Sequence, residues 1–100
     1  MTLLELFEAV KEKNLSKDQL EVYRDDLSSL YADMQIEMAD LEKAEAVYFY
    51  SKTSPEVTDV SIKRTWRVTV SGQRQILLKR YLRGSEKILS SLKSRLYSIF

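Results

Sequence analysis

The stretch LEVYRDDLSSLYADMQIEMADLEKAEAVY, residues Leu20–Tyr48, decides the fold. Apolar side chains recur in it at steps of three and four residues, and neither Gly nor Pro interrupts the pattern. The repeating positions are Leu20, Tyr23, Leu27, Leu30, Met34, Met38, Leu41, Ala44 and Tyr48. Such steps place side chains on one face of an α-helix, close to the heptad seam of a coiled coil. The pattern predicts a long helix over about residues 17–52.

Capping signals indicate one further helix before this one and one after it. Thr2 and Ser16 are each followed three residues later by Glu or Gln, which is the spacing of a capping box. Ser54 is a favoured N-cap residue, and Pro55 suits the first position of a helix. We therefore expect helices over about residues 2–13, 17–52 and 55–99.

The third of these helices has one weak zone, for which the sequence permits two interpretations. Residues 66–70 alternate apolar and polar side chains, which is the period of a strand, and Gly72 follows. Either residues 61–71 are extended and Ser71 caps a helix that starts at Gly72, or the helix continues through the zone. We favour the continuous helix, because five apolar residues keep helical spacing across it. They are Ile62, Trp66, Val70, Leu77 and Tyr81.

The fold class that these elements predict is all-α, with a short N-terminal helix packed on a long antiparallel helical hairpin. A strict heptad seam in the third helix supports the coiled-coil-like hairpin. It consists of Leu78, Leu82, Ser85, Leu89, Leu92, Leu96 and Ile99. The length of the chain, 100 residues, allows one domain over residues 1–100.

The apolar stripes are wider than two helices can cover, and a chain drawn into rods buries less surface than a compact one. We therefore expect a homo-oligomer. Three consecutive aromatic residues near the predicted tip of the hairpin point in three directions on a helix, so one neighbour cannot bury them all. The expected contacts with another subunit or partner are Tyr48, Phe49, Tyr50, Leu78, Leu82 and Leu89.

The composition excludes most catalytic chemistry. The chain has no Cys and no His, which removes disulfides, thiol nucleophiles, imidazole bases and nearly all zinc sites. Asp33, Glu37 and Asp40 share one helical face and could hold a divalent cation, but a solvated or paired acidic face explains them better. We predict no enzyme activity, no metal and no cofactor.

The N-terminal segment has no basic leader, and no apolar run in the sequence reaches the length that spans a membrane. We expect a cytoplasmic protein without a membrane partner.

The charge of the chain is divided between its halves. Residues 1–52 carry 6 basic and 12 acidic side chains, whereas residues 53–100 carry 10 basic and 3 acidic ones. Basic side chains with aromatic residues among them suit single-stranded nucleic acid, since Lys and Arg meet phosphates and bases stack on rings. The predicted phosphate contacts are Lys63, Arg64, Arg67, Arg74, Arg80, Arg83 and Lys87, with Trp66 as a stacking residue. The alternative is that the acidic helix pairs with the basic one and that Trp66 belongs to the core.

Residues 41–99 resemble small phage-encoded helical proteins and, loosely, the T4-type phage recombination mediator. The order of motifs is LEKAEAVYFYSK, then a capped restart with TDVSIKRTW, then LKSRLYSI. The matching positions are Tyr48, Tyr50, Lys63, Lys93, Ser94 and Arg95. The resemblance implies a ring-forming oligomer in the cytoplasm of the phage's host. Such a ring would bind single-stranded DNA and help a recombinase to displace a single-strand-binding protein.

The sequence leaves three functions open. The first is an oligomeric, non-enzymatic accessory protein that binds single-stranded nucleic acid. The second is a protein–protein adaptor or inhibitor, which would dock its hairpin through the YFY stretch or the acidic helix. The third is a structural coiled-coil component of a larger assembly.

Overall fold

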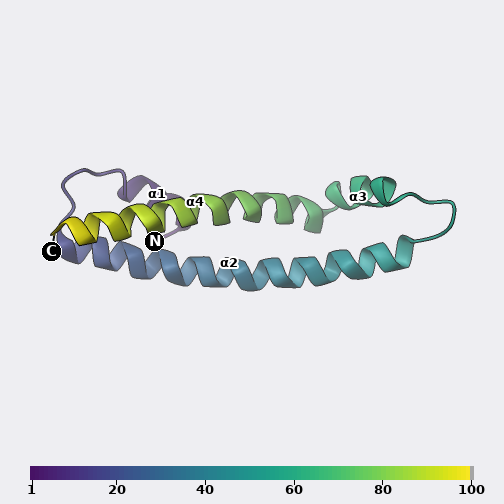
Figure 1. The fold of residues 1–100 in the computed structure, drawn as a ribbon, viewed down its shortest axis with the longest axis horizontal. Coiled ribbons are helices and arrows are strands. Elements are labelled where there is room, and N and C mark those ends of the chain that lie inside the picture. Colours follow the sequence, from purple (N-terminus) through teal and green to yellow (C-terminus); the bar gives the residue numbers. More distant parts are fainter. Residues whose placement is uncertain (100) are drawn as a thin grey trace. The chain divides into compact units, whose positions relative to one another are not determined.

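The computed structural model describes residues 1–99, and this part of the chain is helical, without a strand. Its elements are α1 (Leu3–Ala9), α2 (Lys17–Lys52), α3 (Asp59–Arg67) and α4 (Val70–Ile99), shown in Figure 1. The all-α prediction is confirmed, and α2 has the predicted ends. The first predicted helix is shorter than expected, and the third is divided into two.

The chain forms two compact units. The first unit contains residues 1–33 and the chain from Leu82 onward, and the second contains Met34–Tyr81. α2 and α4 contribute to both units, and in each unit a part of α2 packs against a part of α4. The predicted packing of two long helices as a hairpin is therefore confirmed at the level of these helix pairs.

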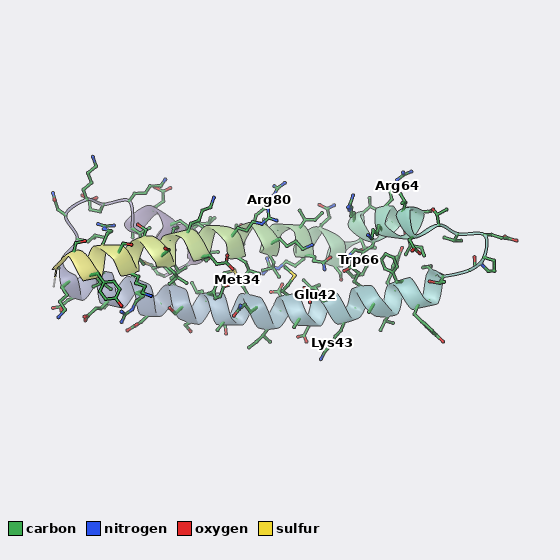
Figure 2. The ribbon with its side chains drawn as sticks, in the orientation of Figure 1. Met34, Glu42, Lys43, Arg64, Trp66 and Arg80 are labelled. Atoms are coloured by element: carbon green, nitrogen blue, oxygen red, sulfur yellow. The ribbon has the colours of Figure 1, made fainter. Side chains whose placement is uncertain are left out.

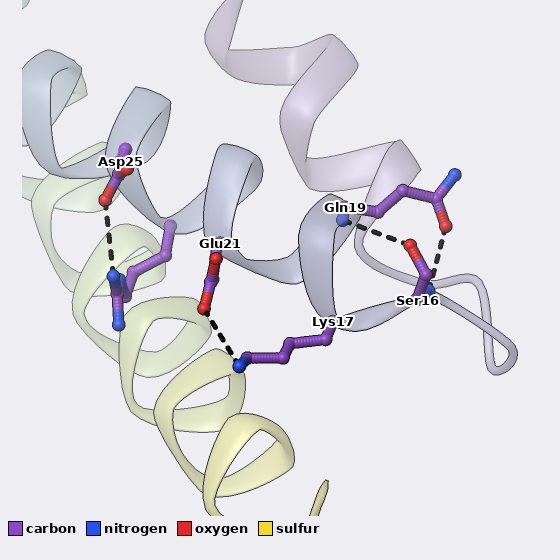
Figure 3. Close-up of polar contacts among 6 residues, drawn as sticks. Ser16, Lys17, Gln19, Glu21 and Asp25 are labelled. Carbon is purple, nitrogen blue, oxygen red and sulfur yellow. Dashed lines mark hydrogen bonds and ion pairs between the residues drawn. The ribbon is translucent and has the colours of Figure 1, made fainter.

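Both predicted capping boxes are present in the first unit. The backbone N–H of Glu5 donates to the Thr2 hydroxyl at 3.2 Å, and this hydroxyl donates to the Glu5 carboxylate at 3.0 Å. At the start of α2, the N–H of Ser16 donates to Gln19 Oε1 at 2.9 Å, and the N–H of Gln19 donates to Ser16 Oγ at 3.2 Å (Figure 3). These bonds satisfy N–H groups that the first turn of a helix leaves without partners.

The core of the first unit joins α1, α2 and α4. Its buried side chains are Leu6, Leu20, Leu27, Leu92 and Leu96, four of which belong to the two predicted seams. Between the same long helices, the Tyr31 hydroxyl donates to Glu86 Oε1 at 2.6 Å. This bond to a carboxylate raises the pKa of Tyr31 above its ordinary value of 10.0. The side chain of Ile99, the last predicted member of the α4 seam, lies outside the described residues.

Arg95 of α4 explains why α1 ends at Ala9 and does not continue to about residue 13. Its guanidinium donates to the backbone carbonyl of Val10 at 2.8 Å and to that of Glu12 at 2.6 Å. The chain after α1 is thus held by these two bonds together with turn hydrogen bonds from Lys11 to Glu8 and from Glu12 to Ala9. These bonds join the segment after α1 to the C-terminal part of α4, beside which α1 lies in Figure 1.

The second unit is built from the C-terminal part of α2, from α3 and from the N-terminal part of α4. Its buried apolar side chains are Met34, Met38, Ile62, Trp66 and Leu78. Trp66 also packs against Tyr48, with ring centroids 5.4 Å apart and an interplanar angle of 55°. The Tyr48 hydroxyl donates to Thr65 Oγ1 at 2.8 Å, so α2 and α3 are joined by polar as well as apolar contacts.

The weak zone of the sequence is a break between two helices, which corrects both interpretations of it. α3 ends at Arg67 and α4 begins at Val70. At the break, the Thr69 hydroxyl donates to the Trp66 carbonyl at 2.6 Å and accepts from the Gly72 N–H at 2.9 Å. One side chain thus serves the last turn of α3 and caps the first turn of α4.

Gly72 permits the close approach of the two helices at this break. A Cβ atom at position 72 would lie 1.9 Å from the carbonyl oxygen of Trp66, which is backbone and cannot rotate away. Gln73 completes the junction, because its side-chain amide donates to the Arg67 carbonyl at 2.5 Å. The glycine that the sequence showed after the weak zone is therefore required by sterics.

The start of α3 also differs from the prediction. Ser54 does not cap a helix; its carbonyl accepts from the Val57 N–H at 3.1 Å in a turn. Thr58 is the N-cap residue, and its hydroxyl accepts from the Ser61 N–H at 3.2 Å. Among the described residues, no helix combines the length and the apolar character needed to cross a membrane.

Candidate nucleic-acid interface

The predicted phosphate contacts are exposed on α3 and α4. Those in the second unit are Lys63, Arg64 and Arg67 on α3, and Arg74 and Arg80 on α4. Arg83 and Lys87 lie on the part of α4 that belongs to the first unit. Figure 2 shows that Arg64 and Arg80 point away from α2, toward solvent.

Arg74 is the one member of this set that pairs with α2 in the described part of the chain. Its Nε donates to Glu37 Oε2 at 2.6 Å, and its second guanidinium nitrogen donates to Glu37 Oε1 at 3.0 Å. This two-pronged contact lowers the pKa of Glu37 and raises that of Arg74. The alternative prediction, in which the acidic helix pairs with the basic one, therefore holds for Arg74. The other six cations form no ion pair with a described residue.

Trp66 is a core residue, which corrects its predicted role in stacking. Its side chain is only 5% exposed, and Figure 2 shows that it points toward α2. The indole N–H donates to Gln75 Oε1 at 2.7 Å. A buried ring with a satisfied N–H offers no face to a nucleic-acid base, so the aromatic part of the predicted interface is lost.

A polar cleft in the second unit brings together cations from both helices. Its volume is about 330 Å³, and Lys63 and Arg67 of α3 line it together with Lys79 of α4. Lys63 and Arg67 are one helical turn apart, so they share a face of α3. The sequence assigned no role to Lys79, although it lies in the same basic run. In one continuous helix, spacing alone would not bring Lys79 close to Lys63 and Arg67. The break at residues 68–69 changes the direction of the chain and places Lys79 beside them.

One carboxylate, that of Glu45, also lines the cleft. Gln75 holds this carboxylate, because its side-chain N–H donates to Glu45 Oε1 at 3.1 Å. Gln75 is itself held by the indole of Trp66. The buried Trp66 therefore contributes to the cleft indirectly, by fixing the amide that positions Glu45. Three cations and one anion give the lining a net positive charge.

The residues predicted to contact another subunit fall into three groups. Leu78 is completely buried in its own unit, so it cannot contact another chain, and Leu89 packs partly against the core of the first unit. Leu82, Tyr48 and Phe49 are half-buried. Tyr50 is 88% exposed and is the member of the set that is open to a partner.

Carboxylates do not gather into a metal site in the described part of the chain. No group of three or more acidic side chains there is arranged to hold an ion. Of the three acids that share a face of α2, Glu37 is engaged by Arg74.

No protein-family model, curated protein or solved structure matches this chain. The site is accordingly interpreted from its own geometry and charge.

Proposed function

We propose that this protein is a non-enzymatic accessory protein that binds nucleic acid through the phosphate backbone. The observation that carries the proposal is the cleft of the second unit, where Lys63, Arg67 and Lys79 converge and form no ion pair with a described residue. Cations that the fold does not neutralise are available to an external polyanion. Their positions on two helices joined by a short, hydrogen-bonded junction reduce the entropy lost when they bind.

The cleft suits a single phosphodiester group. Three cations around one phosphate concentrate the attraction at one point, and the exposed Arg64 and Arg80 offer further contacts nearby in the same unit. Because Trp66 is buried, the cleft has no stacking platform. Affinity should therefore come from the release of counterions, and it should show little preference for base sequence.

The resemblance to the phage recombination mediator supports single-stranded DNA as the natural ligand, with a ring-forming oligomer and a recombinase as partners. These finer assignments are part of the proposal. The cations that line the cleft accord with a role in handling DNA.

The test is a titration of a labelled single-stranded oligonucleotide with protein, followed by fluorescence anisotropy at several salt concentrations. Each single-strand phosphate neutralised by the protein contributes about 0.7 to the slope of log affinity against log salt. If one phosphate occupies the cleft, replacing Lys63, Arg67 and Lys79 together with Gln lowers the slope by about 0.7. If the three cations met three separate phosphates, the slope would fall by about 2.1.

A matched control is Lys52→Gln, since Lys52 is an exposed lysine of the same unit that does not line the cleft. It should leave the slope unchanged. A duplex of the same length, titrated in parallel, measures the preference for single strands. Absence of binding at low salt by the folded protein would reject the proposed function and leave the adaptor as the alternative.

A further inference from the structure

The outer face of α2 carries a short stripe of residues in the second unit that the fold does not use. Ile36 and Val47 are 64% and 69% exposed, and Asp40 and Lys43 lie between them on the same face. Figure 2 shows Lys43 pointing away from α3 and α4. None of the four side chains forms a hydrogen bond or ion pair with a residue in the described part of the chain.

The spacing of the stripe is that of a coiled-coil seam. Its members follow one another at steps of four, three and four residues, which alternate between the a and d positions of a heptad. The buried face of the same segment carries Met34 and Met38. This part of α2 therefore has two seams, of which one is used within the chain.

Isolated exposed apolar residues are common on protein surfaces, so exposure alone does not identify a partner. The order of the charges along the stripe identifies the partner. The midpoint between Ile36 and Val47 coincides with the midpoint between Asp40 and Lys43. A two-fold axis through this point places Ile36 opposite Val47 of a second copy, and Asp40 opposite Lys43 of a second copy. In antiparallel coiled coils, a residues face d residues, which is the pairing required here.

We propose that a second copy of this chain packs antiparallel along this stripe of α2. The contact contains two symmetric Asp–Lys pairs, flanked on each side by an Ile–Val contact. Ala39 and Ala44 share the same midpoint and are exposed, so small side chains border the ion pairs and allow the helices to approach. This contact does not depend on the proposed nucleic-acid binding.

The charges also select the orientation of the two helices. In a parallel, in-register pair, Asp40 would face Asp40 of the second copy and Lys43 would face Lys43. Like charges placed opposite each other at an interface oppose association. The antiparallel pair replaces both repulsions by attractions, so the stripe specifies one orientation.

Charge reversal tests the contact, with sedimentation equilibrium at low salt from micromolar to millimolar protein as the measurement. Asp40→Lys creates two repulsive pairs, one on each side of the axis, and should weaken self-association at least about tenfold. Lys43→Asp should have the same effect. The combined variant Asp40→Lys/Lys43→Asp restores opposite charges and should return the dissociation constant to within about threefold of the original.

Glu42→Lys is the matched control, because it makes the same charge change at an exposed position of α2 that faces another direction. It should leave self-association unchanged. Circular dichroism verifies that every variant remains helical. The proposal is overturned if the unaltered protein stays monomeric at millimolar concentration. It is also overturned if Asp40→Lys and Glu42→Lys act alike, or if the combined variant fails to recover association.

Discussion

The indole N–H of Trp66 donates a 2.7 Å hydrogen bond to the side-chain carbonyl of Gln75, and both side chains are buried. The bond crosses the junction between α3 and α4. Gln75 in turn donates to Glu45 of α2, so three helices are linked through one amide. A polar bridge in this position ties the core of the second unit to the lining of its cleft.

Gln75→Leu should destabilise the protein by about 1–3 kcal/mol, because it leaves the buried indole N–H without an acceptor. Urea unfolding followed by circular dichroism measures this loss. In the double variant Trp66→Phe/Gln75→Leu no donor is stranded, so the total loss should be smaller than the sum of the single losses. Additive losses would show that the two side chains do not act together.

Gly72→Ala should destabilise the protein by about 2–3 kcal/mol, because the new methyl group overlaps the Trp66 carbonyl oxygen and forces the helices apart. Gly84→Ala is a matched control within the same helix. Its methyl group would lie 3.5 Å from the Phe7 ring, an ordinary contact, so the better helix propensity of Ala should stabilise the protein by about 0.5–1 kcal/mol. Thermal unfolding of both variants should therefore give shifts of opposite sign.

Ser85→Ala should stabilise the protein. The Ser85 hydroxyl is 0% exposed and has no hydrogen-bond partner in the described part of the chain. Ser90→Ala, on the exposed side of α4, measures the gain from helix propensity alone, which is about 0.5 kcal/mol. The gain at position 85 should exceed this by about 1 kcal/mol, because a desolvated hydroxyl is also removed. Equal gains would mean that the buried hydroxyl costs nothing.

The pair between Glu37 and Arg74 should make stability depend on pH in the acid range. Arg74 lowers the pKa of Glu37 in the folded protein below its ordinary value of 4.5. The stabilisation is therefore complete above pH 4.5 and is lost as the pH falls through the folded pKa. Its size should be below about 1 kcal/mol, because both side chains are partly exposed to solvent.

Urea unfolding over a range of acid pH values checks this dependence. Glu37→Gln and Arg74→Gln each remove the pair, so both should lose the same part of the acid dependence and differ little from the unaltered protein at the lowest pH. A Glu37→Gln variant with an unchanged acid profile would show that the pair contributes nothing to it.

Glu45→Gln should strengthen nucleic-acid binding about two- to fivefold at low salt, because it removes the one negative charge from the cleft that we propose binds phosphate. The amide oxygen can still accept from Gln75, so the lining keeps its arrangement. Anisotropy titrations with a single-stranded oligonucleotide measure the change. Weaker binding by this variant would mean that Glu45 contacts the ligand as a hydrogen-bond acceptor.

Much of the fold follows from local patterns in the sequence. The uninterrupted seam and the Ser16 capping box define α2 at both ends, and the seam of α4 identifies Leu92 and Leu96 as core residues. The break in the third predicted helix was harder to anticipate. It depends on Thr69 bonding to two helices and on Gly72 lying against a backbone carbonyl, and spacing alone shows neither contact.

The candidate site was predictable in its charge but not in its arrangement. The run of Lys and Arg indicated which segment would be basic. Which cations remain unpaired depends on the turn at residues 68–69, which sets Lys79 beside Lys63 and Arg67 and brings Arg74 to Glu37. Trp66 belongs to the apolar stripe of the sequence, and the stripe predicts the burial that the structure shows. The predicted stacking role required an exposed ring.

The two units differ in how far apart along the chain their partners lie. In the second unit, the polar contacts between α2 and the later helices join residues 17–37 positions apart. In the first unit, the polar contacts of α4 with α2 and with the segment after α1 span 55–85 positions. Closing a longer loop costs more entropy, and pairings of this kind form later in folding. The middle of the chain should therefore fold first. The docking of α1 through Arg95 should be the last step of folding, and α1 should be the first helix to detach on unfolding.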